Sequence, residues 1–339
     1  MNAPTKAMPH PTHKFRLLLR REFWEHKGGF LWAPLVAGGI FLLLSIMGFG
    51  IGEMAARRAT GNFQLDGREG VQINGIDLGA LTSDMDASQL AELGRGVDVS
   101  LVMASSWPFI VLAFVLFFYC IGALYDDRKD RSVLFWKSLP ISDRETVLSK
   151  AVSALVVAPL VATLAALATM LGFLVIASGV VLVHGGNPYA LLWGPGSPMA
   201  LTGEFLANVP VYAIWALPTV GWLLLCSAWS KSKPFLWAIM LPVFSGIFVA
   251  MFDLMQLFDL RTGWFWQHIV GRLLLGVLPG NWLVLGGHSG NVSVDSVAEA
   301  LSPATAWATL AAPGAWIGAA AGIAMILAAI RLRRWRDDN

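Results

Sequence analysis

Residues 125–150 read YDDRKDRSVLFWKSLPISDRETVLSK and form the only long charged segment between two strongly apolar runs. They include six Lys or Arg and five Asp or Glu, and the two signs alternate over a short distance. Such a pattern is typical of a solvated helix that faces a partner. Pro140 cannot continue a helix, and Ser142 or Asp143 can cap a new one. The segment therefore predicts two helices, separated at Leu139 and Pro140, between two membrane spans.

The composition of the whole chain is that of a membrane protein. Of its 339 residues, 56% are hydrophobic and 14% are charged, whereas soluble proteins average roughly a quarter charged residues. Six apolar runs reach the length of about twenty residues that a membrane-crossing helix needs. They are residues 29–51, 101–124, 151–183, 204–227, 235–252 and 306–330. The sequence therefore predicts an all-α membrane protein whose domain, residues 29–330, has six transmembrane helices.

Lys and Arg are distributed unevenly between the two sides of such a domain. Six spans place both termini on one side, together with segment 125–150, and this side holds 18 of the 24 Lys and Arg. Because positive charge is concentrated in cytoplasmic segments, we expect both termini, including the basic tail 331–339, in the cytoplasm. Residues 52–100 are then an extracytoplasmic loop. Within it, Thr82 or Ser83 can cap a short helix that ends at Gly94.

The N-terminal residues 1–28 combine a polar tail with an amphipathic helix. Phe15, Leu19 and Phe23 recur at helical spacing, and Arg16 and Arg20 lie beside them. An apolar stripe flanked by basic residues is typical of a helix that lies in the membrane interface. We therefore expect this helix to contact the lipid bilayer from the cytoplasmic side.

The region before the last span is apolar but broken. Residues 264–285 are interrupted by Arg272, Gly276 and the pair Pro279 and Gly280. These interruptions predict a re-entrant hairpin, since broken helices at membrane depth need protein or water around their backbone. A surface loop is the alternative, although the apolar runs favour the hairpin.

Ionisable residues near the ends of apolar runs have two interpretations. In the first interpretation they only anchor the helix ends at the membrane interface, which is the role of most such residues. The functional interpretation is an outer gate in which Arg272 faces an acid such as Glu53 or Asp259.

The sequence lacks the motifs of common enzymes. There is no G-x-x-x-x-G-K-[ST], no H-E-x-x-H and no G-x-S-x-G. The six His are scattered, and the two Cys, Cys120 and Cys226, lie in separate apolar runs. We therefore expect no catalytic site, no metal and no bound cofactor in this chain. The Trp residues near span ends predict interfacial belts, and we expect no nucleic-acid partner.

Four features together resemble the membrane subunits of ATP-binding-cassette (ABC) type-2 exporters. LLLRREFWEHKGGF (17–30) resembles the connecting helix of that family, and VLPGNWLVLGG (277–287) resembles its broken segment before the last span. The six-span layout agrees. Segment 125–150 resembles the family's cytoplasmic loop between spans two and three. That match is carried by Asp127 and Arg128, by the hydrophobic stretch 133–136, by Leu139 and Pro140 followed by Ser142, and by Lys150. Ser132 stands where many relatives have Gly.

The resemblance implies a permease subunit of an exporter in a bacterial inner membrane. It would pair with a second permease, the same chain or a paralogue, and with two copies of a cytoplasmic ABC ATPase that binds ATP and Mg. Segment 125–150 would hold the coupling helix that docks on this ATPase. The docking residues would be Asp127, Arg128, Arg131, Val133, Leu134, Trp136, Leu139, Pro140, Ser142 and Arg144.

Other functions stay open at this point. A secondary transporter driven by an ion gradient predicts an inverted repeat and ionisable groups near the midplane, and the sequence shows neither. An intramembrane enzyme needs a nucleophile and base at matching depth. Nothing in the sequence excludes a membrane assembly factor that transports nothing. No recognisable motif identifies the substrate. The sequence also leaves open whether the permease forms a homodimer or a heterodimer.

Overall fold

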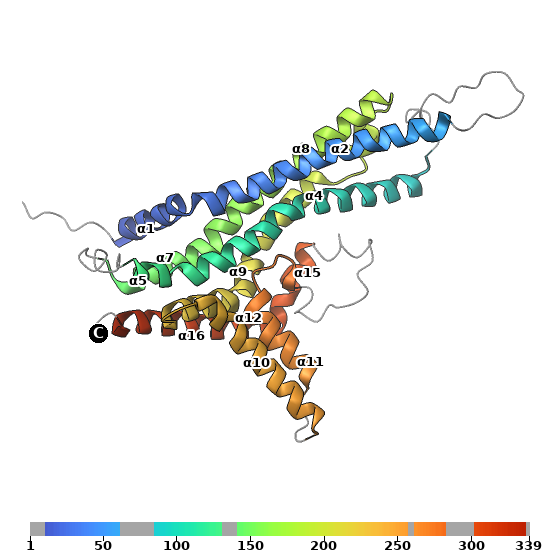
Figure 1. Cartoon of the computed structure of the whole chain (residues 1–339). Helices are drawn as coiled ribbons and strands as arrows, with labels where there is room; N and C mark the ends of the chain where they lie inside the picture. The colour runs from blue at the N-terminus through green and yellow to red at the C-terminus, as the bar shows by residue number, and fades with distance from the viewer. Residues whose placement is uncertain (1–10, 62–84, 131–140, 257–260, 283–301, 337–339) are drawn as a thin grey trace, which may run out of the picture.

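The computed structural model describes residues 11–61, 85–130, 141–256, 261–282 and 302–336. These residues form helices and turns, and none of them forms a β-strand. Among them, six helices are long and apolar enough to cross a membrane: Gly28–Ala55, Ala87–Lys129, Asp143–Val183, Pro198–Trp229, Pro234–Leu254 and Pro313–Trp335. The prediction of an all-α membrane protein with six spans is therefore confirmed (Figure 1).

One end of the molecule collects the parts that are rich in Lys and Arg. Helices α1 (Pro11–Glu25), α5 (Tyr125–Lys129) and α7 (Asp143–Val152) lie there, together with the C-terminal end of α16 (Pro313–Arg336) (Figure 1). We call this the basal end and the opposite one the far end. The location of the basal end in the cytoplasm remains a prediction from the charge distribution.

Both flanks of segment 125–150 continue into spans. Helix α4 (Ala87–Gly122) leads into α5, and α7 passes through a π-helical turn, Ser153–Val157, into α8 (Ala158–Val183). The N–H of Glu145 donates to Ser142 Oγ at 3.2 Å, and the N–H of Ser142 donates to Glu145 Oε2 at 2.9 Å. This capping box confirms that Ser142 caps a helix running into the next apolar run. Residues 131–140 lie outside the described residues.

The far-end connection between α2 (Ala33–Gly61) and α4 is shorter than the predicted loop 52–100, because both helices extend into it. Helix α4 begins after Asp86, whose Oδ1 accepts the N–H of Gln89 at 2.8 Å. The predicted helix end at Gly94 is wrong, since α4 continues through it. A Cβ on Gly94 would overlap the backbone of Pro195. This glycine therefore serves a close approach between segments.

Helix α9 (Pro198–Trp229) forms the centre of the fold. In its most apolar 18-residue window 61% of the residues are buried, against 6% in the window of the first span. It packs along α16, where a Cβ on Gly221 would lie 2.5 Å from the carbonyl oxygen of Gly322. Small residues permit this backbone contact, as at many helix pairs in membranes. Helix α2 instead presents most of its apolar surface outward.

The last span starts later than residue 306, where the sequence predicts it. Helix α15 (Pro303–Ala308) and a 3₁₀ turn, Thr309–Ala311, come first, and Ala312 is extended. Pro313 then begins α16. Apolar composition alone does not reveal this break, although a proline after extended backbone is a common helix start.

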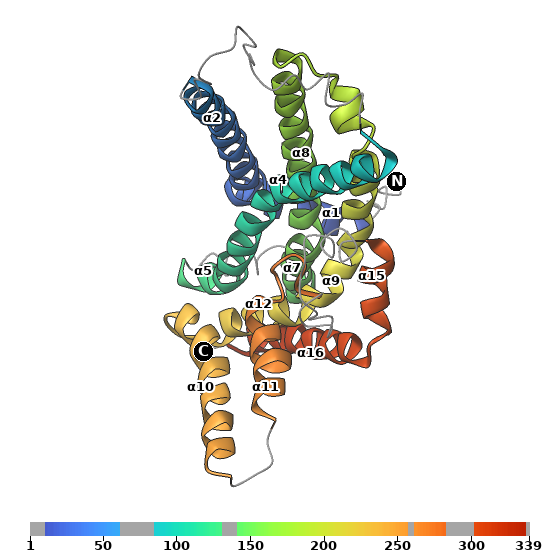
Figure 2. The same ribbon diagram turned by 90° about the vertical axis from the view of Figure 1, so that its right-hand side faces the viewer.

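The broken apolar segment 264–285 contains a helix that lies beside α10 (Pro234–Leu254). Helices α11 (Thr262–Phe265) and α12 (Arg272–Leu275) are joined by a π-helical stretch, η4 (Trp266–Gly271), and contact α10 in a hairpin that projects from the other helices (Figure 2). A turn with Gly280 at φ 76° follows. That residues 264–285 form a re-entrant hairpin of their own in a bilayer remains a prediction.

Candidate functional site

Buried charges connect α1, α4, α5 and α7 at the basal end. The side chains of Glu22 and Lys150 are 1% and 4% exposed, and Lys150 Nζ lies 3.2 Å from Glu22 Oε1. The same Nζ lies 3.6 Å from Asp127 Oδ2. The hydroxyl of Tyr119 donates to Glu22 Oε2 at 2.9 Å. These groups compensate one another, because an isolated buried charge is strongly destabilising.

A second cation extends this cluster to the last span. Arg333 of α16, 5% exposed, donates from Nη1 to Asp127 Oδ2 at 3.2 Å. Its Nε lies 3.3 Å from Asp143 Oδ1. We define the basal ion network as Glu22, Tyr119, Asp127, Asp143, Lys150 and Arg333. The network joins the helix before the first span to the basal ends of the second, third and sixth spans.

Arg128 fastens the same segment to the fourth span. Its guanidinium donates to the carbonyl oxygens of Ser227 and Ser230 at the C-terminal end of α9. The Ser227 hydroxyl oxygen in turn accepts the N–H groups of Leu124 and Tyr125, at 3.0 and 2.9 Å. A cation at a helix C-terminus also complements the partial negative charge of its last carbonyls.

The predicted docking residues fall into three groups. Asp127 and Arg128 are bonded within the chain, whereas Ser142 and Arg144 are exposed at the start of α7. The other predicted docking residues lie outside the described residues: Arg131, Val133, Leu134, Trp136, Leu139 and Pro140. Asp127 and Arg128, which the family resemblance assigns to docking, therefore hold segment 125–150 to the spans. This structural role was not predicted from the sequence.

Helix α1 packs against the protein through a face that neighbours the stripe predicted to contact the bilayer. Leu18 and Glu22 are buried, and the predicted stripe of Phe15, Leu19 and Phe23 is half-buried beside them. Arg16 and Arg20 are exposed, as the interfacial pattern expects. The sequence signal for Glu22 is its spacing of four residues from Leu18, but a charged residue on an amphipathic helix normally faces solvent.

The structure does not bring Glu53 and Arg272 of the predicted outer gate together. Arg272, 7% exposed, donates to the carbonyl oxygens of Gly314 and Ala315 and lies 4.5 Å from the ring centroid of Trp215. It thus fastens α12 to α9 and α16.

Of the two acids of that gate, Glu53 has another partner. Glu53 Oε2 lies 2.6 Å from His184 Nε2, which joins the far ends of α2 and α8. Asp259 lies outside the described residues. Its pairing with Arg272 therefore stays a prediction.

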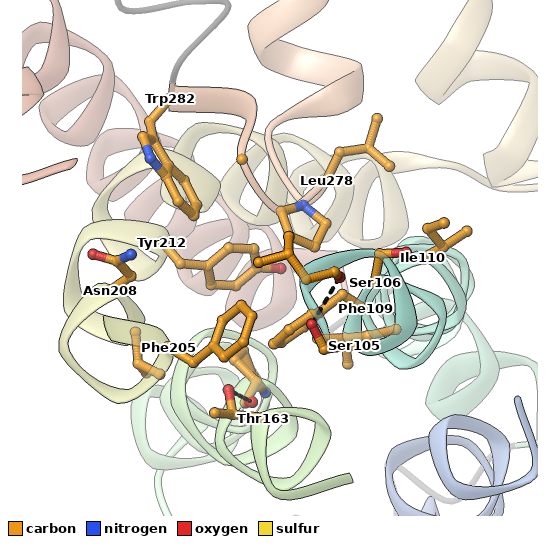
Figure 3. Close-up of a pocket in the computed structure, with 16 residues that line it drawn as sticks. Ser105, Ser106, Phe109, Ile110, Thr163, Phe205, Asn208, Tyr212, Leu278 and Trp282 are labelled. Atoms are coloured by element: carbon orange, nitrogen blue, oxygen red, sulfur yellow. Dashed lines mark hydrogen bonds between the residues drawn. The ribbon is translucent and has the colours of Figure 1, made fainter. Parts of the chain in front are cut away.

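An apolar cavity of about 210 Å³ lies between α4, α8, α9 and the turn after α12 (Figure 3). Phe109, Phe205, Tyr212, Leu278 and Trp282 are among the side chains that line it (Figure 3). No charged residue of the described chain is among its lining. Its walls come from the second, third and fourth spans and from the segment before the last one.

The side-chain hydroxyls around the cavity are used by the protein itself, whereas the buried Nε1 of Trp282 has no hydrogen-bond partner among the described residues. The hydroxyls of Ser105 and Thr163 donate to carbonyl oxygens of their own helices, each at 2.8 Å. The hydroxyl of Tyr212 donates to the carbonyl oxygen of Val277 at 3.0 Å and so ties the turn to α9. The cavity therefore offers a hydrocarbon-like surface.

No protein-family model matches the chain, and its comparison with curated proteins and with solved structures gives no match either. The six apolar helices identify a multi-pass membrane protein.

Proposed function

We propose that the chain is the permease subunit of an ABC exporter, which moves a substrate out of the cytoplasm with energy from ATP hydrolysis on a separate ATPase. One observation carries this proposal: the basal ion network fastens both flanks of segment 125–150 to the ends of several spans. Asp127 lies on one flank and Lys150 on the other, and they are 3.6 Å apart. A push on the residues between them therefore has a short path to the spans.

The desolvation cost of the buried charges favours a mechanical role for this segment. Burying several charges costs desolvation energy, whereas a plain connecting loop can leave its charges in water. Here the charges fix α5 against α7 and α16, and α7 continues into the third span. Small displacements at such a packed junction are transmitted as movements of whole helices, because packed interfaces have discrete arrangements.

The proposal assigns the contact with the ATPase to residues 131–144. Charge pairs would set the register there, and apolar side chains such as Trp136 and Leu139 would supply most of the affinity. ATP and Mg would bind to the ATPase, in two copies for each complex. A second permease, identical or paralogous, would complete a pathway between them in a bacterial inner membrane. The outward apolar surface of α2 is available to lipid or to this second permease.

The test is co-purification of the full chain with the products of its neighbouring genes. We expect an ATPase with the G-x-x-x-x-G-K-[ST] motif to co-elute. Trp136→Asp and Leu139→Asp should each lower its recovery at least about tenfold, because the acid is left unpaired in the contact. Met199→Asp makes the same apolar-to-acid change at a far-end position that is 85% exposed, and should keep wild-type recovery.

The outcomes separate the proposal from its rivals. If no such ATPase co-elutes, the proposal fails. Transport in vesicles that lack any ATPase, abolished when an ion gradient is collapsed, would identify a secondary transporter. Co-elution of a different membrane complex, without transport, would identify an assembly factor. Wild-type recovery with both Asp variants would place the docking surface outside residues 131–140.

A further inference from the structure

The walls of the apolar cavity restrict what can occupy it. Its volume of about 210 Å³ exceeds the ~150 Å³ of an engineered apolar cavity that stays dry and binds benzene. The side-chain hydroxyls of Ser105, Thr163 and Tyr212 already donate to backbone carbonyls. An occupant therefore gains mainly by burying hydrocarbon, because the described lining holds no charged residue and the unpartnered Nε1 of Trp282 is itself buried. A charged group would lose its hydration without compensation.

The cavity reaches the lipid-facing side of α4. Ile110 belongs to its lining and is 41% exposed (Figure 3). Phe114 and Phe118 follow Ile110 at helical spacing and are 62% and 59% exposed, so this face of the span is apolar and open. In a bilayer the rim at Ile110 meets hydrocarbon. Molecules that partition into the membrane can therefore reach the cavity without crossing water.

The wall opposite α4 and α8 is a shaped turn. Leu278, Pro279 and Gly280 lie against the cavity, and Trp282 follows with an exposure of 4%. Gly280 has φ 76°, a conformation that L side chains rarely adopt. The hydrogen bond from Tyr212 to Val277 holds this turn on α9. One wall of the cavity is therefore formed by the segment before the last span that the sequence predicts to be broken.

We infer that this cavity binds the alkyl chain of a lipid-like amphiphile whose polar head stays outside it. As a statement about cargo, the inference rests on the proposed exporter function: the exported molecule carries such a chain. As a statement about binding, it rests on the cavity alone. Phe109 and Phe205 offer the aromatic contact surface on which the alkyl chain packs.

The experiment uses the purified full chain without an ATPase, in lipid nanodiscs doped with a fatty acid that carries a diazirine at its chain end. Photolysis followed by peptide mapping should place cross-links on Phe109, Phe205 or Trp282. Excess unlabelled fatty acid should lower this labelling at least fivefold. Cross-links confined to outward side chains of α2 and α10 would overturn the inference, because those sites report bulk lipid.

Variants test the cavity itself. Ser105→Leu fills the space and should lower cavity labelling at least fivefold. Ser45→Leu is the matched control, because the Ser45 hydroxyl also donates to its own helix, at Phe41, and lies outside the cavity; it should label like the wild type. Phe205→Ala enlarges the cavity and should raise labelling of the remaining walls, which keeps the test decisive if Ser105→Leu does not fold. Unchanged labelling in Ser105→Leu and Phe205→Ala would contradict the inference.

A second label distinguishes the two sources of an alkyl chain. The same diazirine is placed at the end of a phospholipid acyl chain in the nanodisc. Labelling by the fatty acid supports a cargo that enters from the membrane, whereas labelling by the phospholipid alone overturns the assignment to cargo. Because no ATPase is present, a failure here leaves the co-purification result untouched, and a failed co-purification leaves this binding result untouched.

Discussion

Replacing Lys150 by Met removes the central cation of the basal ion network and keeps a side chain of similar length. The variant leaves the Glu22 carboxylate, 1% exposed, with the Tyr119 hydroxyl as its hydrogen-bond donor and with His26 Nδ1 3.9 Å from Oε2. Asp127 is less affected, because Arg333 still donates to it at 3.2 Å. We therefore expect the loss of stability to come mainly from the uncompensated charge of Glu22.

The magnitude follows from the geometry. Coulomb's law at an effective dielectric constant of about 20 gives ~5 kcal/mol for the 3.2 Å contact between Lys150 and Glu22. Removing one partner of a buried pair typically costs about 3–5 kcal/mol. We expect Lys150→Met to lower the free energy of unfolding by this amount. The double variant with Glu22→Gln should recover about 2 kcal/mol or more of the summed single effects, because neither charge then remains unpaired.

The assay is reversible unfolding in mixed micelles with increasing SDS, followed by Trp fluorescence. Arg21→Met is the matched control, since Arg21 pairs with Glu25 on the same helix with side chains 28% and 50% exposed. It should cost at most ~1 kcal/mol, as surface pairs do. The reasoning is refuted if Lys150→Met unfolds within about 0.5 kcal/mol of the wild type, or if the effects of the two buried variants simply add.

Two further predictions concern other parts of the fold. Gly322→Ala should lower the free energy of unfolding by about 1–3 kcal/mol, because its Cβ would lie 2.6 Å from the carbonyl oxygen of Leu217. Gly314→Ala is the control, since its Cβ would have no neighbour closer than 3.9 Å. It should be nearly neutral in the same SDS titration. Hydrogen bonds from the Ser88 hydroxyl and the Gln89 N–H lower the pKa of Asp86. The stabilisation of the start of α4 by this cap is therefore fully present above the ordinary pKa of an aspartate. It is lost as the pH falls through the lowered pKa of Asp86 in the folded protein. Asp86→Ala should therefore speed amide exchange at residues 87–90 several-fold at neutral pH, measured by mass spectrometry, and this difference should vanish in strong acid; equal rates at neutral pH would contradict it.

The spans could be predicted because their signal is one of composition and length. Each of the six runs is apolar enough to identify without knowledge of its neighbours, and the cap at Ser142 follows from a local pattern with Glu145. The ends of the spans were less predictable. Gly94 reads as a helix end in isolation, and its role in approaching Pro195 depends on a segment about a hundred residues away.

The candidate sites were less predictable because they depend on tertiary contacts. Glu22, Lys150 and Arg333 each look like ordinary surface charges on their own helices. Their burial follows from the packing of α1, α7 and α16 around Asp127. The apolar cavity is equally hidden, since its wall residues have the same composition as lipid-facing ones. Arg272 shows the reverse case: sequence reasoning singled it out, but for a carboxylate partner and not for the carbonyl groups of α16.

The contact between Asp127 and Arg333 also imposes an order on biogenesis. The two residues are 206 positions apart, and Lys150 is synthesised long before Arg333. During synthesis, Asp127 can pair with Lys150 as soon as the third span begins, but its second cation arrives with the end of the last span. A chain that stops short of Arg333 therefore keeps an incompletely neutralised acid between its helices. Completion of this contact therefore requires the sixth span.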